Sequence, residues 1–249
     1  MSTPPRRRVA LFVTCIVDQI YPSVGLAAAR LLEAQGCDVS VPRGLTCCGQ
    51  MGFNAGFRDE ARAVAGRTIE LLRGQGDLVL PSGSCAAMIR HLYGELFHGT
   101  PHQAAAAELA GRTYELTEYL VDVLGAADVG ARFAGRVAYH DACHGLRYLG
   151  LGRQARLLLG HVAGAEIAPL AGADECCGFG GLFAVKQAPI SEAMLARKLS
   201  GVAAAGADLV VTGDASCMTQ IAGGASRAGS RTRVRHIAEL LANMVDRRL

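Results

Sequence analysis

The sequence predicts an α/β protein built from two copies of one unit, each with a parallel sheet, and three observations lead to this fold class. Eight of the nine cysteines recur at a nearly constant spacing of 128 to 132 residues. Short apolar segments alternate with segments of helical periodicity in both halves of the chain. With 51% hydrophobic residues over 249 positions, the chain is able to fill a substantial core. We therefore expect one unit over residues 1–125 and a second over residues 126–249.

The first half contains three apolar segments that we expect to be strands, at residues 9–14, 39–41 and 77–80. Between them, apolar residues three and four positions apart, followed by a glycine, predict helices over residues 23–35 and 58–73. A further helix over residues 102–124, which begins after Pro101 and ends at Gly125, is expected to join the two halves. Strands that alternate with helices indicate parallel pairing through right-handed crossovers.

The second half follows the same order. Strands are expected at residues 136–139 and 208–212, and helices over residues 152–161 and 190–206. The chain is therefore predicted to form two pseudo-symmetric Rossmann-like βα units, each of which gathers the carboxyl ends of its strands at one edge of a sheet. Because most of the repeated cysteines follow a predicted strand, we expect the four cysteines of each half to converge at such an edge.

The repeated cysteines form two matched series. Each series has a single cysteine, a Cys-Cys-Gly triplet and a second single cysteine, and the triplets lie 129 residues apart. The candidate ligands are Cys15, Cys47, Cys48 and Cys85 in the first half and Cys143, Cys176, Cys177 and Cys217 in the second. Chance placement of structural cysteines would not produce this repeat. Cys37 has no counterpart and is expected to be a small buried apolar residue.

Four converging thiolates bind either Zn²⁺ or an iron–sulfur cluster. Structural zinc sites usually take their ligands from close pairs such as Cys-x-x-Cys, whereas here one pair is directly adjacent and the other two cysteines are distant. Adjacent cysteines point in different directions, which favours a multinuclear cluster. Glycine-rich stretches such as Phe179-Gly180-Gly181 allow close backbone approach to a cluster, although such turns are also common without a ligand. A zinc-stabilised scaffold that docks partners and a thiol–disulfide oxidoreductase remain as alternatives.

Two histidines flank one of these cysteines. His140 and His144, with Arg147 nearby, either brace a strand end or act on a bound cluster through hydrogen bonding or proton transfer. The remaining five histidines have no repeat partner and no ligand spacing, and they are expected at the surface or within helices: His91, His98, His102, His161 and His236.

Composition and motifs argue against several other functions. The formal net charge of +3, from 25 basic and 22 acidic residues, is too even for a nucleic-acid-binding surface. No apolar run has the length of a membrane span. The basic and apolar start, Arg6-Arg7-Arg8 before residues 9–13, is similar to a signal peptide, but an equivalent segment recurs at residues 136–139, so both are interpreted as strands and the chain is expected in the cytoplasm. No strand precedes G-x-G-x-x-G, so hydride chemistry is expected on a partner.

The motifs around the cysteines resemble those of one family. They are Cys47-Cys48-Gly49-Gln50, Pro81-Ser82-Gly83-Ser84-Cys85, His140-Asp141-Ala142-Cys143-His144, Cys176-Cys177-Gly178-Phe179-Gly180-Gly181 and Gly213-Asp214-Ala215-Ser216-Cys217. In combination they resemble the duplicated cysteine-rich (CCG) domains of the lactate-utilisation protein A family. The same domains are more distantly similar to those of the cysteine-rich subunit of heterodisulfide reductase and of the glycolate oxidase and anaerobic glycerol-3-phosphate dehydrogenase iron–sulfur subunits.

This resemblance implies an iron–sulfur component of a three-protein system that oxidises L-lactate to pyruvate. Its expected partners are a larger ferredoxin-like iron–sulfur subunit and a third small subunit. In the heterodisulfide reductase relatives, the last cysteine of each domain begins a Cys-x-x-Cys motif, whereas here Met88 and Gln220 occupy the matching positions. Each half therefore offers four thiolates, which suit a cubane [4Fe–4S] cluster, and one or two such clusters are expected, with zinc as the alternative.

Overall fold

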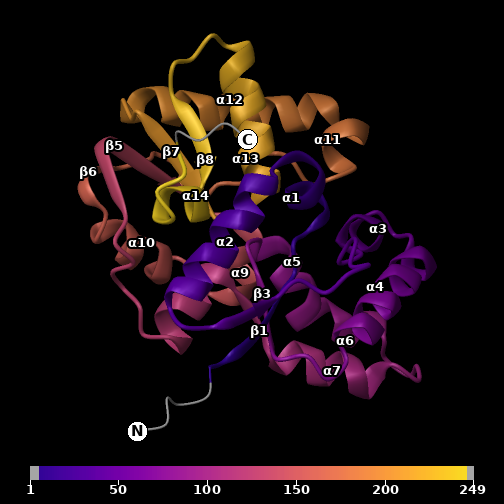
Figure 1. Cartoon of the computed structure of the whole chain (residues 1–249). Coiled ribbons are helices and arrows are strands. Elements are labelled where there is room, and N and C mark those ends of the chain that lie inside the picture. The colour runs from indigo at the N-terminus through magenta and orange to yellow at the C-terminus, as the bar shows by residue number, and fades with distance from the viewer. Residues whose placement is uncertain (1–5, 246–249) are drawn as a thin grey trace, which may run out of the picture.

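The computed structural model describes residues 6–245 and has an α/β fold with two four-stranded sheets, one in each half of the chain (Figure 1). Within each sheet, neighbouring strands run parallel. The strand orders are β2-β1-β3-β4 and β6-β5-β7-β8, so the second sheet repeats the topology of the first. The predicted fold class is therefore confirmed, including the position of the cysteines near strand ends.

The first half carries four strands and the helices that connect them. Their bounds are β1 (Arg8–Leu11), α1 (Cys15–Ile20), α2 (Pro22–Ala34), β2 (Asp38–Ser40), α3 (Gln50–Asn54), α4 (Arg58–Leu72), β3 (Asp77–Leu80), α5 (Gly83–Ala87), the π-helix η1 (Met88–Leu92), α6 (Tyr93–Leu96), α7 (Gln103–Gly111), β4 (Thr113–Glu115), α8 (Leu116–Glu118) and the π-helix η2 (Tyr119–Val123). The predicted strands and helices up to residue 80 are all present, with ends that differ by a few residues.

The second half has the same plan. Its elements are β5 (Arg132–His140), α9 (Cys143–Leu149), α10 (Arg153–Gly160), β6 (Ala163–Ala168), α11 (Phe183–Lys186), α12 (Ala188–Ala205), β7 (Leu209–Thr212), α13 (Ala215–Arg227), β8 (Arg233–His236) and α14 (Ile237–Leu241). Since the last strand of the first sheet ends at Glu115 and the next sheet begins at Arg132, we propose the loop around Gly125 as the boundary between the two units.

The prediction of one continuous helix over residues 102–124 is wrong. This segment contains α7, the short strand β4, α8 and η2. Thr113 pairs with Leu78 at the edge of the first sheet, and the Glu115 side chain then starts a new helix by accepting hydrogen bonds from the backbone N–H groups of Thr117 and Glu118. A strand of three residues is too short to interrupt the apolar periodicity visibly, so tertiary pairing decides the outcome.

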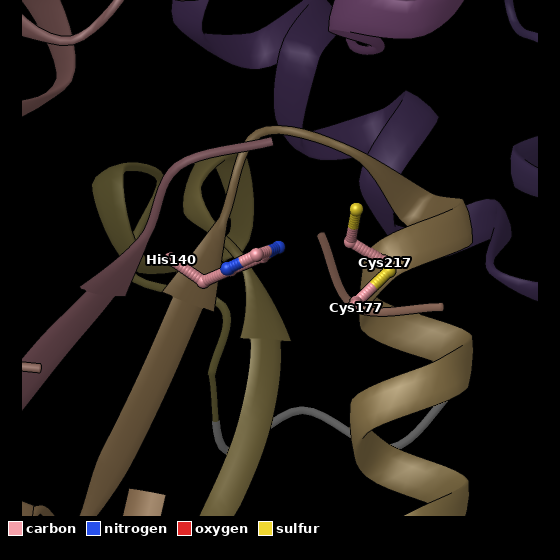
Figure 2. Close-up of side chains that lie close together, drawn as sticks. All are labelled: His140, Cys177 and Cys217. Atoms are coloured by element: carbon pink, nitrogen blue, oxygen red, sulfur yellow. The ribbon is translucent and has the colours of Figure 1, made fainter. Parts of the chain in front are cut away.

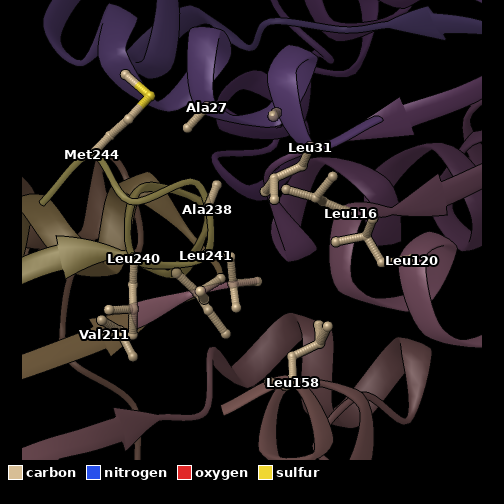
Figure 3. Close-up of a cluster of buried hydrophobic side chains, with 14 of the residues drawn as sticks. Ala27, Leu31, Leu116, Leu120, Leu158, Val211, Ala238, Leu240, Leu241 and Met244 are labelled. Carbon is tan, nitrogen blue, oxygen red and sulfur yellow. The ribbon is translucent and has the colours of Figure 1, made fainter. Parts of the chain in front are cut away.

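A central core holds the two halves together. It contains apolar side chains from α2, α8 and η2 of the first half and from α10 and α14 of the second, packed between the two sheets (Figure 3). Leu31, Leu116 and Leu120 approach Leu158 and Leu241 in this region, and each is at most 4% exposed. Burial of so many apolar side chains across the halves indicates that they fold as one body.

Each outer face of the pair of sheets has its own apolar cluster. Helices α4, α6 and α7 cover the first sheet, and helices α12 and α13 cover the second. The two short helices that begin with a cysteine cross to the opposite half: α1 contacts α13, and α9 contacts α5. Val17 of α1 accordingly lies in the outer cluster of the second half. The carboxyl edges of the two sheets therefore face one another.

The helices of residues 6–245 include none that is both long enough and apolar enough to cross a membrane.

Candidate metal centre

In the first half, three connections bring four cysteines to the carboxyl edge of the sheet. Cys15 begins α1, the first helix after β1, and the pair Cys47-Cys48 lies between β2 and α3. Cys85 follows β3 within α5, and its backbone N–H donates to the Oγ of Ser82, the residue that caps this helix. The Sγ atoms of Cys48 and Cys85 are 3.2 Å apart. The thiol of Cys47 interacts with those of both Cys15 and Cys48, which completes a chain of four sulfurs.

The second half repeats this chain of contacts. Cys143 begins α9 after β5, the pair Cys176-Cys177 lies between β6 and α11, and Cys217 lies in the first turn of α13 after β7. The thiol of Cys176 interacts with those of Cys143 and Cys177, and that of Cys177 also interacts with Cys217. In both halves the first cysteine of the series and the first of the pair are half-buried, while the other two are buried.

All eight cysteines line a single cavity of ≈ 120 Å³ between the two halves. Residues that follow the two Cys-Cys-Gly turns, including Met51 and Gly181, also line it. The nine cysteines are all free thiols. Cys37, by contrast, lies 2% exposed in the central core, which confirms the expectation that it is a buried apolar residue.

Hydrogen bonds between the thiols of each series shift their pKa values in opposite directions. Hydrogen bonding with Cys47, together with burial, raises the pKa of Cys15 well above its usual range, while the same hydrogen bond lowers the pKa of Cys47. Cys143 and Cys176 behave identically in the second half. Adjacent thiolates repel one another in a buried site, so all four sulfurs can ionise together only with a cation between them.

A glycine supports each Cys-Cys-Gly turn. Gly49 and Gly178 have φ values of 85° and 89°, in the left-handed region, and their backbone N–H groups lie 3.4 Å from the Sγ atoms of Cys47 and Cys176. A Cβ atom at Gly49 would lie 3.0 Å from the carbonyl oxygen of Ala61, and one at Gly178 would lie 2.7 Å from that of Ser191. Both turns therefore need glycine, and both direct an amide hydrogen at a cysteine sulfur.

The histidines near Cys143 have different surroundings. His140, the last residue of β5, is fully buried, and one of its ring nitrogens lies with the sulfurs of Cys177 and Cys217 in a group whose atoms are all within 4.8 Å of one another (Figure 2). His144 Nδ1 lies 3.6 Å from the Sγ of Cys143, and its ring stacks on Tyr148. Arg147 lies exposed in the last turn of α9.

The expectation for His236 is wrong. His236 ends β8, is fully buried, and accepts a hydrogen bond from the backbone N–H of Ala238, which caps α14. A polar residue at a strand end gives no local sign of burial. The side chains of His91, His98 and His161 are exposed and that of His102 is half-buried, as expected.

Sequence reasoning missed the polar junction that joins the two series. One carboxylate oxygen of Asp214 accepts hydrogen bonds from the backbone N–H of Ser84, at 2.8 Å, and from the Ser82 hydroxyl, at 3.2 Å. The other oxygen accepts from the backbone N–H and the hydroxyl of Ser216. Asp214 and Ser82 are buried helix caps at matched places in the two halves, a relation that the 132-residue offset would have revealed.

The residues of the cavity fit an iron–sulfur cluster in each half. Each half presents four thiols in a continuous chain of contacts, a backbone N–H directed at sulfur, and one side of a shared cavity. The positions that would supply a fifth thiol have other roles, because Met88 is fully buried in the outer cluster of the first half and Gln220 donates to the Oγ of Ser191. Four thiolates in each half match the ligand number of a [4Fe–4S] cluster.

Comparison with known proteins agrees with this picture. A family described as "Cysteine-rich domain" (CCG) matches residues 9–90 and again residues 137–222. The chain is 46% identical to lactate utilization protein A of Geobacillus kaustophilus (strain HTA426) and 43% identical to that of Bacillus subtilis (strain 168), each over 94% of this chain and 98% of the relative. It is 44% identical to the protein of the same name in Exiguobacterium sp. (strain ATCC BAA-1283 / AT1b), over 94% of this chain and 96% of the relative. The chain therefore belongs to the lactate utilization protein A family and contains two cysteine-rich domains.

Proposed function

We propose that this protein is the iron–sulfur electron-transfer subunit of a complex that oxidises L-lactate to pyruvate. The observation that carries the proposal is that eight cysteines from two repeated units line one cavity. We assign Cys15, Cys47, Cys48 and Cys85 to one [4Fe–4S] cluster, and Cys143, Cys176, Cys177 and Cys217 to another. When bound, such a cluster accepts and donates one electron at a time.

The residues of the chain have defined tasks in this proposal. The thiolates hold iron, and the amides of Gly49 and Gly178 donate towards sulfur and so stabilise negative charge. Burial of Cys48, Cys85, Cys177 and Cys217 keeps water from half of the ligands. Since both series line the same cavity, an electron has a short path from one half to the other.

The proposed partners follow from the family. Its members are named for lactate utilization, and this supports a role in the cytoplasm alongside a ferredoxin-like iron–sulfur protein and a third small subunit. The chain contains no G-x-G-x-x-G turn after a strand for a dinucleotide cofactor, so we assign hydride chemistry to a partner.

The test is iron, zinc and acid-labile sulfide content, together with an electron paramagnetic resonance spectrum, on protein purified anaerobically and reduced with dithionite. We expect about four irons and four sulfides per occupied half. With the two partner subunits present, L-lactate should replace dithionite as the reductant. Stoichiometric zinc without sulfide would instead identify a zinc-stabilised docking scaffold. Thiols that cycle through a disulfide without any metal would identify a thiol–disulfide oxidoreductase.

A further inference from the structure

The two cysteine series have matching backbones but different neighbours. Three residues before the first cysteine of each series, the first half has Phe12, directly after β1, and the second has His140, the last residue of β5, and both side chains are fully buried. The residue that follows the first cysteine is Ile16 in the first half and His144 in the second. At both places an apolar residue beside the first series matches an imidazole beside the second.

At two further matched positions, the residue in the second half is again more polar than its counterpart in the first half. The strand before the last cysteine ends at Leu80 in the first half and at Thr212 in the second. The helix after each triplet can be aligned through the carbonyl groups of Ala61 and Ser191, which contact the turn glycines at matched places.

Seven residues beyond these carbonyls, the aligned helices place Thr68 opposite Lys198. Lys198 is 2% exposed and interacts electrostatically with Cys177 and Cys217. Its ammonium group donates to the carbonyl oxygen of Gly172, so it is held in place beside the second series. At these matched positions, the imidazoles and the ammonium group therefore lie beside the second series only.

The imidazole of His140 interacts with the thiol of Cys217 and has no nitrogen or oxygen partner among the described residues. The hydroxyl of Thr212, the residue opposite His140 in the register of β5 and β7, has no hydrogen-bond partner among them either. Buried polar groups are seldom left unpaired in folded proteins. Figure 2 shows the ring pointing towards the side chains of Cys177 and Cys217. A sulfur-rich group held by the second series would supply the missing acceptor.

We propose that His140 donates a ring N–H to the cluster held by the second cysteine series and thereby makes the second site the easier of the two to reduce. This inference rests on the proposed function, since it requires a cluster at each site. Reduction adds negative charge, which hydrogen-bond donors and nearby cations stabilise. Phe12 offers no donor at the first site, so a cluster held by the second series would have the higher midpoint potential.

Acidic side chains near the second series offset only part of this difference, and Asp174 and Glu175 act on Lys198 itself. The carboxylate of Glu175 pairs with Arg197 at 3.0 Å, and that of Asp141 pairs with Arg156 at 2.6 Å. Asp214 lines the cavity that both series share, and its oxygens accept hydrogen bonds from both halves. Its charge acts on Cys143 and Cys217 of the second series and so offsets part of the effect of His140 and Lys198.

The experiment is an anaerobic redox titration of the full-length protein, loaded with iron and sulfide and followed by electron paramagnetic resonance. Cys48→Ser and Cys177→Ser variants assign the signals to the two sites. In the wild type, the second site should have the higher midpoint potential. In His140→Phe, the ratio of reduced to oxidised second cluster at a fixed potential should fall about tenfold, which is ~59 mV for a one-electron couple. The first site should be unchanged.

Two matched variants act as controls. His140→Gln keeps an N–H donor and should keep the second midpoint close to that of the wild type, and Phe12→His should raise the midpoint of the first site. The inference is overturned if the first site has the higher wild-type midpoint, or if both sites load fully and His140→Phe leaves the second midpoint in place. If His140→Phe does not load, Phe12→His decides, and an unmoved first midpoint overturns the inference. Failure of the proposed function is distinct, because wild-type protein would then contain no iron and no sulfide.

Discussion

The first cysteine series follows β1, β2 and β3, and the second follows β5, β6 and β7, with a Cys-Cys-Gly turn at the same place in each. The chain of sulfur contacts and the glycine that supports each turn are the same in both halves. The neighbouring side chains differ, as Phe12 and His140 illustrate. The duplicated parts are those that we assign to a metal centre, whereas the parts that differ are those that would set its electrical environment.

A second matched pair lies behind the cavity. Glu115 caps α8 after the last strand of the first sheet, and His236 caps α14 after the last strand of the second. Each side chain accepts from the helix backbone, and a glutamate three residues later bonds back to the backbone N–H of the capping residue. The geometry of the cap is thus kept while the titrating group has changed from an acid to a base.

The largest expected effect comes from removing one ligand in each half. Cys48→Ser and Cys177→Ser should each lose about four irons and leave the other site loaded, because each thiol belongs to a separate series. Iron and sulfide analysis of the two variants measures this directly. Cys37→Ala is the matched control and should keep all of its iron, since Cys37 lies in the central core. Loss of all iron from either single variant would mean that the eight thiols hold one shared centre.

The cysteine repeat made this part of the molecule predictable. A spacing that recurs for all eight cysteines, combined with strands that end near cysteines, predicted two series at sheet edges, and the structure places all eight at one cavity. The sequence did not indicate that α1 and α9 cross to the opposite half, because that exchange depends on how two apolar faces meet in space.

Short or polar strands were the other part of the fold that the sequence did not predict. β4, with three residues, was hidden within helical periodicity, and β6 is an edge strand with mostly exposed side chains and no apolar run. β8 has the sequence Arg-Val-Arg-His, and its charged residues give no sign that the strand is partly buried. Because this strand was not predicted, the burial of His236 at its end was not predicted either. The local sequence pattern therefore predicts strands that are apolar, but it does not predict strands that are held only by hydrogen bonds to a neighbouring strand.

The two caps should respond to pH in opposite directions. Burial raises the pKa of Glu115 to about 7, so the stability that its neutral form contributes is full below about 4.5, its unfolded pKa, and is lost as the pH rises through 7. Burial lowers the pKa of His236 to about 4, so its contribution is present above about 6.5 and is lost as the pH falls through 4.

Replacing either capping residue should remove its contribution to the pH dependence of the free energy of unfolding. As the pH rises from 5 to 8, the free energy of unfolding of Glu115→Gln should increase by about 3 kcal/mol relative to that of the wild type, since one pKa unit corresponds to ~1.4 kcal/mol. His236→Asn, which keeps a capping side chain, should gain a comparable amount between pH 7 and pH 4. Chemical denaturation at a series of pH values measures both. Parallel pH profiles for wild type and variants would show that these groups do not titrate with folding.

A smaller effect is expected at the junction between the halves. Asp214→Asn removes a charged acceptor that bonds Ser82, Ser84 and Ser216, so we expect a loss of about 2 kcal/mol in the free energy of unfolding. Ser82→Ala, the matched cap in the first half, removes the hydrogen bond from the Cys85 N–H and only one of the hydrogen bonds to the Asp214 carboxylate, and should cost about 1 kcal/mol. Denaturation curves of the two variants test this order, and equal losses would mean that the carboxylate charge adds nothing at the junction.

The smallest expected difference separates the two turn glycines. Gly49→Ala and Gly178→Ala both place a Cβ in the left-handed region, which costs about 1–2 kcal/mol for an L-residue. At Gly49 the new atom would lie 3.0 Å from a backbone oxygen, and a shift of a few tenths of an ångström relieves the contact, whereas the 2.7 Å approach at Gly178 requires a larger movement of α12. Gly178→Ala should therefore unfold at the lower temperature and lose iron faster on dilution. Identical melting temperatures would show that the second turn adjusts as readily as the first, and the two halves would then differ only in the side chains that face the cavity.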